Sequence, residues 1–301
     1  MNKYIVEKYS SYEAKEIQSG YRCQTFLLKK KENKYIYQVY FDETKYQAEK
    51  KKYITELIKK SVDIPEIPNI IEYGERDEFA YLVTEYKEGV ELDKTDRDII
   101  NYKKFYESLA NILIKIHQVD IGQKFGWIGK NGLEGKEFFY EYIENEIKRN
   151  VKKIQDIIGS ENDIVKEINE KADRVLNEIK KINDSKPVLS WYDINPNNIL
   201  VDEKGTIKGF LDAGGARFAS KEWELAFIKM DLCRDKQEFE YFKKVYSRKN
   251  SINEKLLNLL TVIVEIDDIA FQLETNTKLP ISFASNFKEI LNQIQYSMES
   301  E

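Results

Sequence analysis

The spacing of hydrophobic positions changes once along this chain of 301 residues. Before about residue 86, short runs of β-branched and aromatic residues predict strands separated by turn formers. These runs span residues 25–28, 35–41, 70–73 and 80–83. Only one stretch in this part has helical spacing, which predicts a helix at about 45–60 that ends before Pro65 and Pro68.

After Gly89 the hydrophobic pattern is mostly helical. Helices are predicted at 98–118, 136–158, 161–183, 221–247, 253–275 and 284–298. Three short strands are predicted inside this half, at 187–190, 199–201 and 207–211. The sequence therefore predicts an α+β protein with a small sheet-rich lobe over residues 1–86 and a larger helical lobe over residues 87–301.

Three polar residues stand where these short strands end. Asp193 and Asn198 lie between the first two strands, and Asp212 follows the third. Phosphoryl transfer from a magnesium nucleotide needs a carboxylate that accepts the proton of the attacking hydroxyl, and separate oxygen ligands for the metal. Asp193 is thus the candidate base, and Asn198 and Asp212 are the candidate Mg²⁺ ligands. The alternative is a polar loop without chemistry, because turn formers separate Asp193 from Asn198.

Composition and charge narrow the choice of class. The chain is 42% hydrophobic, as globular proteins are, and its net charge of −5 comes from interspersed acidic and basic residues without a basic stripe for nucleic acid. The lysine runs at 29–31 and 50–52 are expected to be solvated faces. Cys23 and Cys233 fit neither a disulfide framework nor a metal site and are expected to be reduced thiols. No targeting or membrane-spanning stretch is evident, so we expect a cytoplasmic protein without a membrane partner.

The segment from Trp191 to Asp212 resembles the catalytic loop of the aminoglycoside phosphotransferase and choline kinase-like family, distant relatives of protein kinases. That family's pattern is His-x-Asp, four residues, Asn, and an aspartate at the end of the next hairpin. Asp193, Asn198 and Asp212 match this pattern, and Trp191 departs from it. Glu224, followed by Leu and Ala, stands where the family has the aspartate of an Asp-Leu-Ala segment. The resemblance implies a bilobal protein-kinase-like fold with ATP or GTP between the lobes.

The resemblance also implies where the nucleotide binds. Ser19 and Gly20 fall between two strands, where the N–H groups of a tight turn can bind phosphates; an ordinary hairpin turn is the alternative. After the last strand of the small lobe, the C=O of Glu85 and the N–H of Lys87 would bond the purine edge.

The largest departure from the family lies on the strand at 35–41. There the family has a lysine that contacts the phosphates and pairs with a helix glutamate; Gln38 stands in its place, and Glu49 fits the glutamate. A neutral hydrogen bond contributes less than a charge-assisted one, so we expect another cation to compensate. Arg22 is the candidate, and a solvated arginine is the alternative.

Two further residues are expected to be architectural. The family histidine packs beneath the metal aspartate, and the ring and single N–H donor of Trp191 can replace it. His117 is the only histidine and ends a Leu-x-x-Ile-His pattern that the family shares. It is expected to be a satisfied core or interface residue, so the chain lacks a well-placed histidine for Ser-His-Asp or zinc chemistry.

The predicted function is a small-molecule O-phosphotransferase that uses Mg²⁺ to transfer the γ-phosphate of ATP or GTP to a hydroxyl. Acidic groups in the helical lobe would suit a cationic aminoglycoside or amino alcohol, although helix carboxylates usually form a solvated face. These groups are Glu141, Glu144, Asp267 and Asp268. The competing hypothesis, motivated by Gln38 and Trp191, is a nucleotide-binding or scaffold protein of the same fold that has lost transfer activity.

Overall fold

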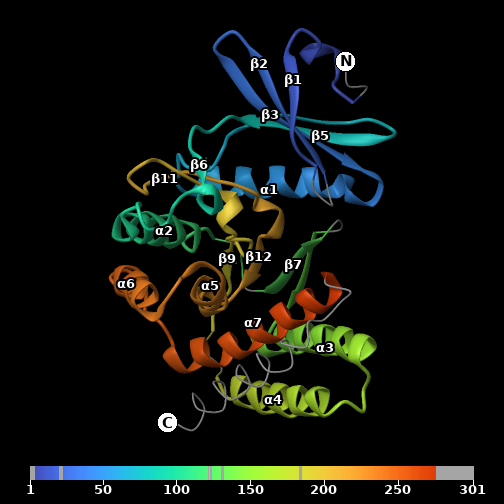
Figure 1. Ribbon diagram of the computed structural model, residues 1–301. Helices are drawn as coiled ribbons and strands as arrows, with labels where there is room; N and C mark the ends of the chain where they lie inside the picture. Colours follow the sequence, from blue (N-terminus) through green and yellow to red (C-terminus); the bar gives the residue numbers. More distant parts are fainter. Residues whose placement is uncertain are drawn as a thin grey trace.

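The structure is a computed structural model that describes residues 4–19, 23–120, 122, 124–129, 132–182 and 185–275. A five-stranded sheet lies at one end of the molecule, and most of the helices lie at the other end (Figure 1). The catalytic loop predicted from the sequence belongs to the second part, close to where the two parts meet.

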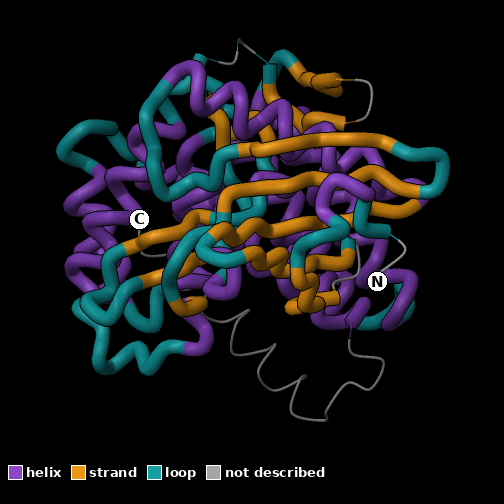
Figure 2. Tube along the Cα trace, turned by 90° about the horizontal axis from the view of Figure 1, so that it is seen from above, coloured by secondary structure: helices purple, strands orange, loops and turns teal. Residues whose placement is uncertain are grey.

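The five-stranded sheet is antiparallel, with the strand order β1-β2-β3-β5-β4. Its strands are β1 (Glu13–Ser19), β2 (Gln24–Lys30), β3 (Asn33–Phe41), β4 (Ile70–Glu75) and β5 (Phe79–Glu85), and the helix after β3 is α1 (Lys45–Ser61). Seen from above, its strands run side by side across the molecule (Figure 2). All five strands precede residue 86, and the division into two domains at this residue stays a prediction.

Strand β3 divides its side chains between the two faces of the sheet, because successive side chains of a strand point to opposite sides. Tyr37 and Val39 are buried in a hydrophobic cluster on one face. Tyr40 packs on the other face against Ala48 of α1. Gln38, two residues from Tyr40, therefore points to the face of the sheet that carries α1.

Helix α1 connects the sheet to the helical part of the molecule. Ala48 faces the sheet, whereas Ile54 and Ile58 belong to the large hydrophobic cluster that is formed mainly by the helical part. Figure 1 shows α1 between the two parts. Side chains of α1 can therefore contact the catalytic loop directly.

Two small antiparallel sheets frame the loops of the helical part. Their strand orders are β11-β10-β6 and β8-β7-β12-β9. The strands are β6 (Val90–Glu91), β7 (Phe125–Gly129), β8 (Gly132–Lys136), β9 (Val188–Ser190), β10 (Ile199–Val201), β11 (Ile207–Phe210) and β12 (Arg217–Ala219).

Helices form the remainder of this part, with α3, α4 and α5 packed against α7 and α2 packed against α6. They are α2 (Tyr102–Ile116), α3 (Phe139–Ile158), α4 (Asp163–Ile179), α5 (Lys221–Phe227), α6 (Lys236–Tyr246) and α7 (Glu254–Thr275). Several begin at a residue whose side chain accepts a hydrogen bond from a backbone N–H of the first turn, which stabilises a helix start. Asn101 does so at α2, Asn162 at α4 and Ser220 at α5.

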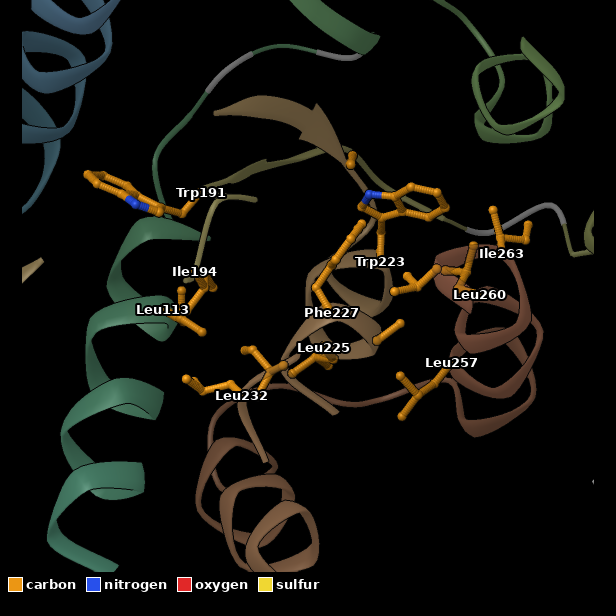
Figure 3. Packing of buried hydrophobic residues seen from close by; sticks show 14 of the residues in the cluster. Leu113, Trp191, Ile194, Trp223, Leu225, Phe227, Leu232, Leu257, Leu260 and Ile263 are labelled. Atoms are coloured by element: carbon orange, nitrogen blue, oxygen red, sulfur yellow. The ribbon is translucent and has the colours of Figure 1, made fainter. Parts of the chain in front are cut away.

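Two buried tryptophans lie in the large hydrophobic cluster. Trp191 and Ile194 lie near the end of α2, while Trp223 and Phe227 lie toward Leu260 of α7 (Figure 3). A packed core therefore supports the loop that begins at Trp191.

The structure confirms most of the predicted elements, and the exceptions have physical reasons. The helix predicted at 221–247 is wrong, because a π-helical turn at Ile228–Leu232 separates α5 from α6. The N–H of Cys233 bonds the C=O of Ile228 at 3.0 Å, the five-residue spacing of a π-turn, which helical periodicity does not reveal. The sequence pattern implied a strand before Ser19 without giving the bounds of β1, and it missed β6, β7, β8 and β12. The predicted helix at 284–298 lies outside the described residues.

Candidate active site

The buried carboxylate of Glu224, on α5, holds the start of the loop that carries Asp193. Its Oε1 accepts hydrogen bonds from Ser190 Oγ at 3.2 Å and from the backbone N–H of Tyr192 at 2.9 Å. Tyr192 has a φ of 67°, a left-handed conformation that costs about 1–3 kcal/mol and persists only where the surroundings enforce it. Glu224 therefore fixes the backbone immediately before Asp193.

His117 contacts Glu224 from the opposite side. Its Nε2 lies 2.5 Å from Glu224 Oε2, and its Nδ1 lies 2.6 Å from the hydroxyl of Tyr246. The side chain is 2% exposed. The prediction of a satisfied core histidine is confirmed. Within the described part of the chain, the hydrogen bonds of His117 reach the catalytic loop only through Glu224.

Trp191 connects the catalytic loop to the segment that carries Asp212. Its indole N–H donates to the C=O of Leu211 at 3.1 Å, and its ring centroid lies 4.8 Å from that of Phe210. Leu211 directly precedes Asp212 in the chain. The architectural role expected for Trp191 is therefore confirmed: it packs and bonds beneath the candidate metal ligand.

Backbone and side-chain hydrogen bonds bring the three predicted residues together. The Nδ2 of Asn198 donates to the backbone C=O of Asp193 at 3.3 Å, and the C=O of Asn198 accepts from the N–H of Leu211 at 2.8 Å. The carboxylate of Asp193 accepts a hydrogen bond from Asn195 Nδ2. Asp193, Asn198 and the segment before Asp212 thus form one bonded unit.

Two glycines let the two aspartates approach each other. Asp212 has a φ of 62°, and its Oδ1 accepts the N–H of Gly214 at 2.9 Å. A Cβ on Gly215 would lie 2.9 Å from the Cβ of Asp193, too close for any side chain. The loop of Asp193 therefore packs against the backbone that follows Asp212.

Lys51 of α1 forms an ion pair with Asp212. Its Nζ lies 2.9 Å from Asp212 Oδ1 and 5.3 Å from the ring centroid of Tyr40, and the residue is 7% exposed. Loss of water alone would lower the pKa of the Lys51 ammonium, but the charge of Asp212, together with the interactions with Tyr40 and Cys23, raises the pKa above its usual range. Lys51 and its buried neighbour Lys50 correct the expectation that the lysine run at 50–52 is a solvated face.

Acidic residues of the helical part lie on the side of Asp193 away from the sheet. Asp267 of α7 accepts hydrogen bonds from Asn150 Nδ2 at 2.7 Å and from the hydroxyl of Tyr192 at 3.2 Å. Asp268 is exposed and accepts from Gln272 at 2.7 Å. Asp267 is thus tied to the residue that precedes Asp193.

A further carboxylate, Asp231 of the π-helical turn, lies near these residues. The sequence analysis did not predict it. Its surface is exposed, yet partial loss of water, followed by the negative charges of Asp268, Asp267 and Asp193, raises the pKa of its carboxyl to about 6. No sequence signal marks Asp231, because the π-helical turn that carries it was predicted as part of one continuous helix. Four carboxylates therefore lie close enough to interact.

The other two acidic candidates lie apart from these four. Glu144 pairs with Lys148 at 2.9 Å, and the hydrogen bond from Lys148, with the charges of Lys148 and Lys180, lowers the pKa of its carboxyl. Glu141, on the first turn of α3, is half-buried. Neither residue has a recorded bond to Asp193 or Asp267 within the described part of the chain.

The oxygen atoms of Asn198 and Asp212 suit a Mg²⁺ ion that is also bound by nucleotide phosphates, rather than a metal ion bound by protein groups only. No group of three or more His, Cys, Asp or Glu in the described residues could hold a metal ion. Mg²⁺ is commonly bound by one or two protein oxygens together with the phosphates of a nucleotide. Because the Nδ2 of Asn198 is used by the backbone, its carbonyl oxygen is left to accompany the carboxylate of Asp212 as such a ligand. The donors therefore fit the ion.

A family model for the phosphotransferase enzyme family, APH, matches residues 13–246. The chain belongs to this family. A comparison with curated protein sequences finds no significant match.

Solved structures of similar fold include phosphotransferases and a protein described as a fructosamine-3-kinase. A thermostable mutant of aminoglycoside phosphotransferase APH(4)-Ia has a TM-score of 0.72 and 18% identity, covering 97% of this chain and 99% of that one; the same enzyme has been solved with AMP-PNP and hygromycin B. A protein described as a fructosamine-3-kinase, from Haemophilus somnus 129PT, has a TM-score of 0.69 and 15% identity, covering 94% and 92%. Spectinomycin phosphotransferase APH(9)-Ia, solved with ADP and spectinomycin, has a TM-score of 0.63 and 18% identity, covering 96% and 93%. The kinase-like α+β fold predicted from the sequence is confirmed.

Strand β3 places the side chain of Gln38 next to Tyr40 and Cys23. Gln38 accepts a hydrogen bond from the hydroxyl of Tyr40 at 3.0 Å, and its Nε2 lies 3.8 Å from the Sγ of Cys23. Glu49 is exposed on α1 and has no recorded hydrogen bond to Gln38 in the described residues. Gln38 therefore bonds Tyr40 rather than Glu49. Glu49 faces solvent, whereas Lys51 lies on the buried face of α1.

Some of the predicted nucleotide residues can be located and some cannot. Gly20 and Arg22 lie outside the described residues; Ser19 is the last residue of β1, paired with Gln24. Glu85 ends β5, and Lys87 Nζ lies 2.8 Å from its Oε1. Loss of water would raise the pKa of the Glu85 carboxyl, but its hydrogen bonds with Lys87 and Asn69 lower it overall.

Arg217 of β12 was also missed by the sequence analysis. It is fully buried, and its guanidinium carbon lies 3.3 Å from the ring centroid of Trp127 and 3.1 Å from that of Tyr192. Its Nη1 donates to the hydroxyl of Tyr142 at 2.8 Å and lies 3.5 Å from Glu146. Stacking on Tyr192 makes Arg217 a second support of the catalytic loop.

The remaining expectations concern membranes and cysteines. Within the described residues, none of the helices is long and apolar enough to cross a membrane. Cys23 and Cys233 are free thiols, as expected.

Proposed function

We propose that the chain transfers the γ-phosphate of ATP or GTP to a hydroxyl of a small molecule. The observation that carries this proposal is the bonded unit of Asp193, Asn198 and the segment before Asp212. It supplies one carboxylate beside two metal-binding oxygens, as phosphoryl transfer requires. A polar loop without chemistry would have no need for the supports that Glu224 and Trp191 give it.

Asp193 is the proposed base. It accepts the proton of the acceptor hydroxyl as the oxygen forms its bond to the γ-phosphorus and the bond to the leaving nucleoside diphosphate breaks. The bond from Asn195 orients the carboxylate. Transfer is in line, so the acceptor lies on the side of Asp193 that faces away from the sheet.

Asn198 and Asp212 are the residues that would hold Mg²⁺. When bound, the ion would offset the negative charge of the nucleotide's phosphates. The N–H of Gly214 donates a hydrogen bond to the carboxylate of Asp212, so this carboxylate is already oriented before a ligand binds.

The nucleotide is proposed to bind between the sheet and the helical part. In this arrangement the C=O of Glu85 and the N–H of Lys87 bond the purine edge, and the turn at Ser19 and Gly20 lies over the phosphates. The complexes of similar structures with AMP-PNP and with ADP support a nucleotide donor. ATP and GTP both remain as donors, and the proposed location of the reaction is the cytoplasm.

The acceptor is proposed to be a small hydroxylated molecule with a positive charge. The carboxylates of Asp231, Asp267 and Asp268 put negative charge beside Asp193, and this charge would attract a cationic amine. Hygromycin B and spectinomycin, bound by two of the similar enzymes, support an aminoglycoside-type acceptor. Glu141 and Glu144 would be peripheral contributors at most, since Glu144 is already paired.

The competing function is a nucleotide-binding or scaffold protein of the same fold. The neutral Gln38 on β3 favours it, because the strand offers no ammonium to the phosphates. The ordered supports of Asp193 oppose it.

Thermal unfolding with Mg-ATP and Mg-GTP, followed by phosphate transfer to aminoglycosides, amino alcohols and simple sugars, separates the two. We expect a rise in Tm with at least one nucleotide and a phosphorylated product detected by mass spectrometry. Nucleotide stabilisation without hydrolysis or any product would favour the scaffold, and no nucleotide binding would contradict both.

A further inference from the structure

Among the described residues, the candidate metal ligand Asp212 forms an ion pair with a lysine of helix α1 rather than with a cation of strand β3. Lys51 Nζ is 2.9 Å from Asp212 Oδ1, whereas Gln38 on the strand bonds Tyr40. On the basis of the function proposed above, we propose that Lys51 binds the phosphates of the nucleotide in place of a strand lysine.

The position of Lys51 suits this role. Mg²⁺ holds its oxygen ligands at about 2.0–2.1 Å, so two oxygens that share an ion lie within about 4 Å of each other. A phosphate oxygen that shared an ion with Asp212 would therefore lie near an ammonium that already contacts Asp212. Only a small rotation of the flexible lysine stem is needed to exchange one oxygen for the other.

The surroundings hold the ammonium at this place. The ring of Tyr40 lies beneath it at 5.3 Å, and the hydroxyl of Tyr40 donates to Gln38. Gln38 thus positions the aromatic platform of Lys51 instead of contacting phosphate itself. Lys51 of the helix would then take the role that the family gives to the strand lysine.

The backbone near Asp212 leaves space for the lysine stem. A Cβ on Gly214 would lie 2.9 Å from Lys51 Cε and 2.8 Å from Asp212 Oδ1. A side chain at this position would force Lys51 or the Asp212 carboxylate to shift. The glycine therefore favours the contact between Lys51 and Asp212, and this contact spans from α1 to the catalytic segment.

Lys51 is buried, whereas Lys52, the next residue of the helix, is exposed. Lys51 is 7% exposed, whereas the side chain of Lys52 is 40% exposed and lies 3.9 Å from Glu56. Lys52→Met removes the same charge and the same length of side chain without touching Asp212. It is the matched control for Lys51→Met.

The test measures binding of ATP, ADP and adenosine to the two variants and the wild type by titration calorimetry. Loss of one charge-assisted hydrogen bond is expected to weaken ATP and ADP binding by about 10- to 100-fold in Lys51→Met. Adenosine, which lacks phosphates, is expected to bind all three proteins equally. The ADP effect is expected to shrink as salt rises, because part of the attraction is screened.

Two further variants keep the test decisive. Gln38→Lys in the Lys51→Met background is expected to restore part of the ADP affinity, since the new ammonium lies on the same face of the sheet. Lys51→Arg keeps the charge and is expected to retain phosphate-dependent binding, which provides a reading even if Lys51→Met folds poorly.

Equal ADP affinity in Lys51→Met and Lys52→Met would overturn the assignment of Lys51. A matching loss of adenosine and ADP affinity would also overturn it, because it would indicate a structural effect only. A wild-type protein that binds no nucleotide would instead contradict the proposed function, so the two failures are distinguishable.

Discussion

The carboxylate of Glu224 accepts a 2.9 Å hydrogen bond from the backbone N–H of Tyr192, the residue directly before Asp193. The same carboxylate accepts from Ser190 and contacts His117. Three groups thus converge on one buried side chain of α5, and the orientation of the proposed base depends on it.

Glu224→Gln tests this dependence. The glutamine keeps the shape but points an NH₂ group at one of the donors, so we expect the free energy of unfolding to fall by about 1–3 kcal/mol. We also expect turnover to fall more than nucleotide affinity, because the altered backbone lies at Asp193 and not at the purine. Denaturant unfolding and steady-state kinetics measure the two effects.

The control is Glu203→Gln, in the exposed turn between β10 and β11. If Glu224→Gln matched this control in stability and in turnover, the support proposed for the catalytic loop would be wrong.

Asp212→Asn tests the metal site. Asparagine tolerates the left-handed backbone of this position and can still accept the Gly214 N–H, so the change removes charge with little strain. Because Mg²⁺ depends on carboxylates, we expect the Mg²⁺ concentration for half-maximal stabilisation by ADP to rise by about tenfold or more. Thermal unfolding at a series of Mg²⁺ concentrations provides the measurement. Asp156→Asn, on the exposed side of α3, is the control, and an unchanged Mg²⁺ dependence in Asp212→Asn would make Asp212 a strand-end carboxylate only.

The buried carboxyl of Glu265, on α7, is expected to make the free energy of unfolding depend on pH. Its Oε2 is buried without a hydrogen-bond partner among the described residues, and loss of water raises the pKa of its carboxyl to about 7 despite the opposing charges of Lys229 and Lys171. The folded-state pKa is therefore above the unfolded value of about 4.5. As pH rises from 4.5 to 7, the unfolded chain loses this proton first, and the folded state is destabilised.

Glu265→Gln removes the ionisation. We expect the variant to equal the wild type in stability near pH 4 and to exceed it by about 2–3 kcal/mol at pH 8, measured by urea unfolding. Glu161→Gln, with a 92% exposed side chain, should show no such trend. A stability gain that is the same at both pH values would contradict the raised pKa.

Local patterns in the sequence, together with the family resemblance, were sufficient to propose the catalytic loop. Asp193, Asn198 and Asp212 are close in sequence, and the short strands between them fix their relative positions, so their spacing was informative. The role of Trp191 was also predictable, because one ring with one donor has few ways to replace a histidine beneath Asp212.

Contacts between distant elements could not be predicted in the same way. Lys51 stands in a run of lysines, and only the packing of α1 against η5 (Ala213–Gly215) reveals that this lysine faces Asp212. Glu49 was chosen for its chemistry, but its place on the helix turns it to solvent. Asp231 depends on a π-turn that hydrophobic spacing does not signal.

The central claim is that Asp193 is the base of a working phosphotransferase. The most direct measurement compares Asp193→Ala with wild type and with the surface control Asp156→Ala, following phosphate transfer from Mg-ATP or Mg-GTP to the acceptor found in the panel. We predict that transfer falls by about 10²- to 10⁴-fold in Asp193→Ala only, while nucleotide affinity stays within about twofold of wild type. Near-wild-type transfer by Asp193→Ala would contradict the account.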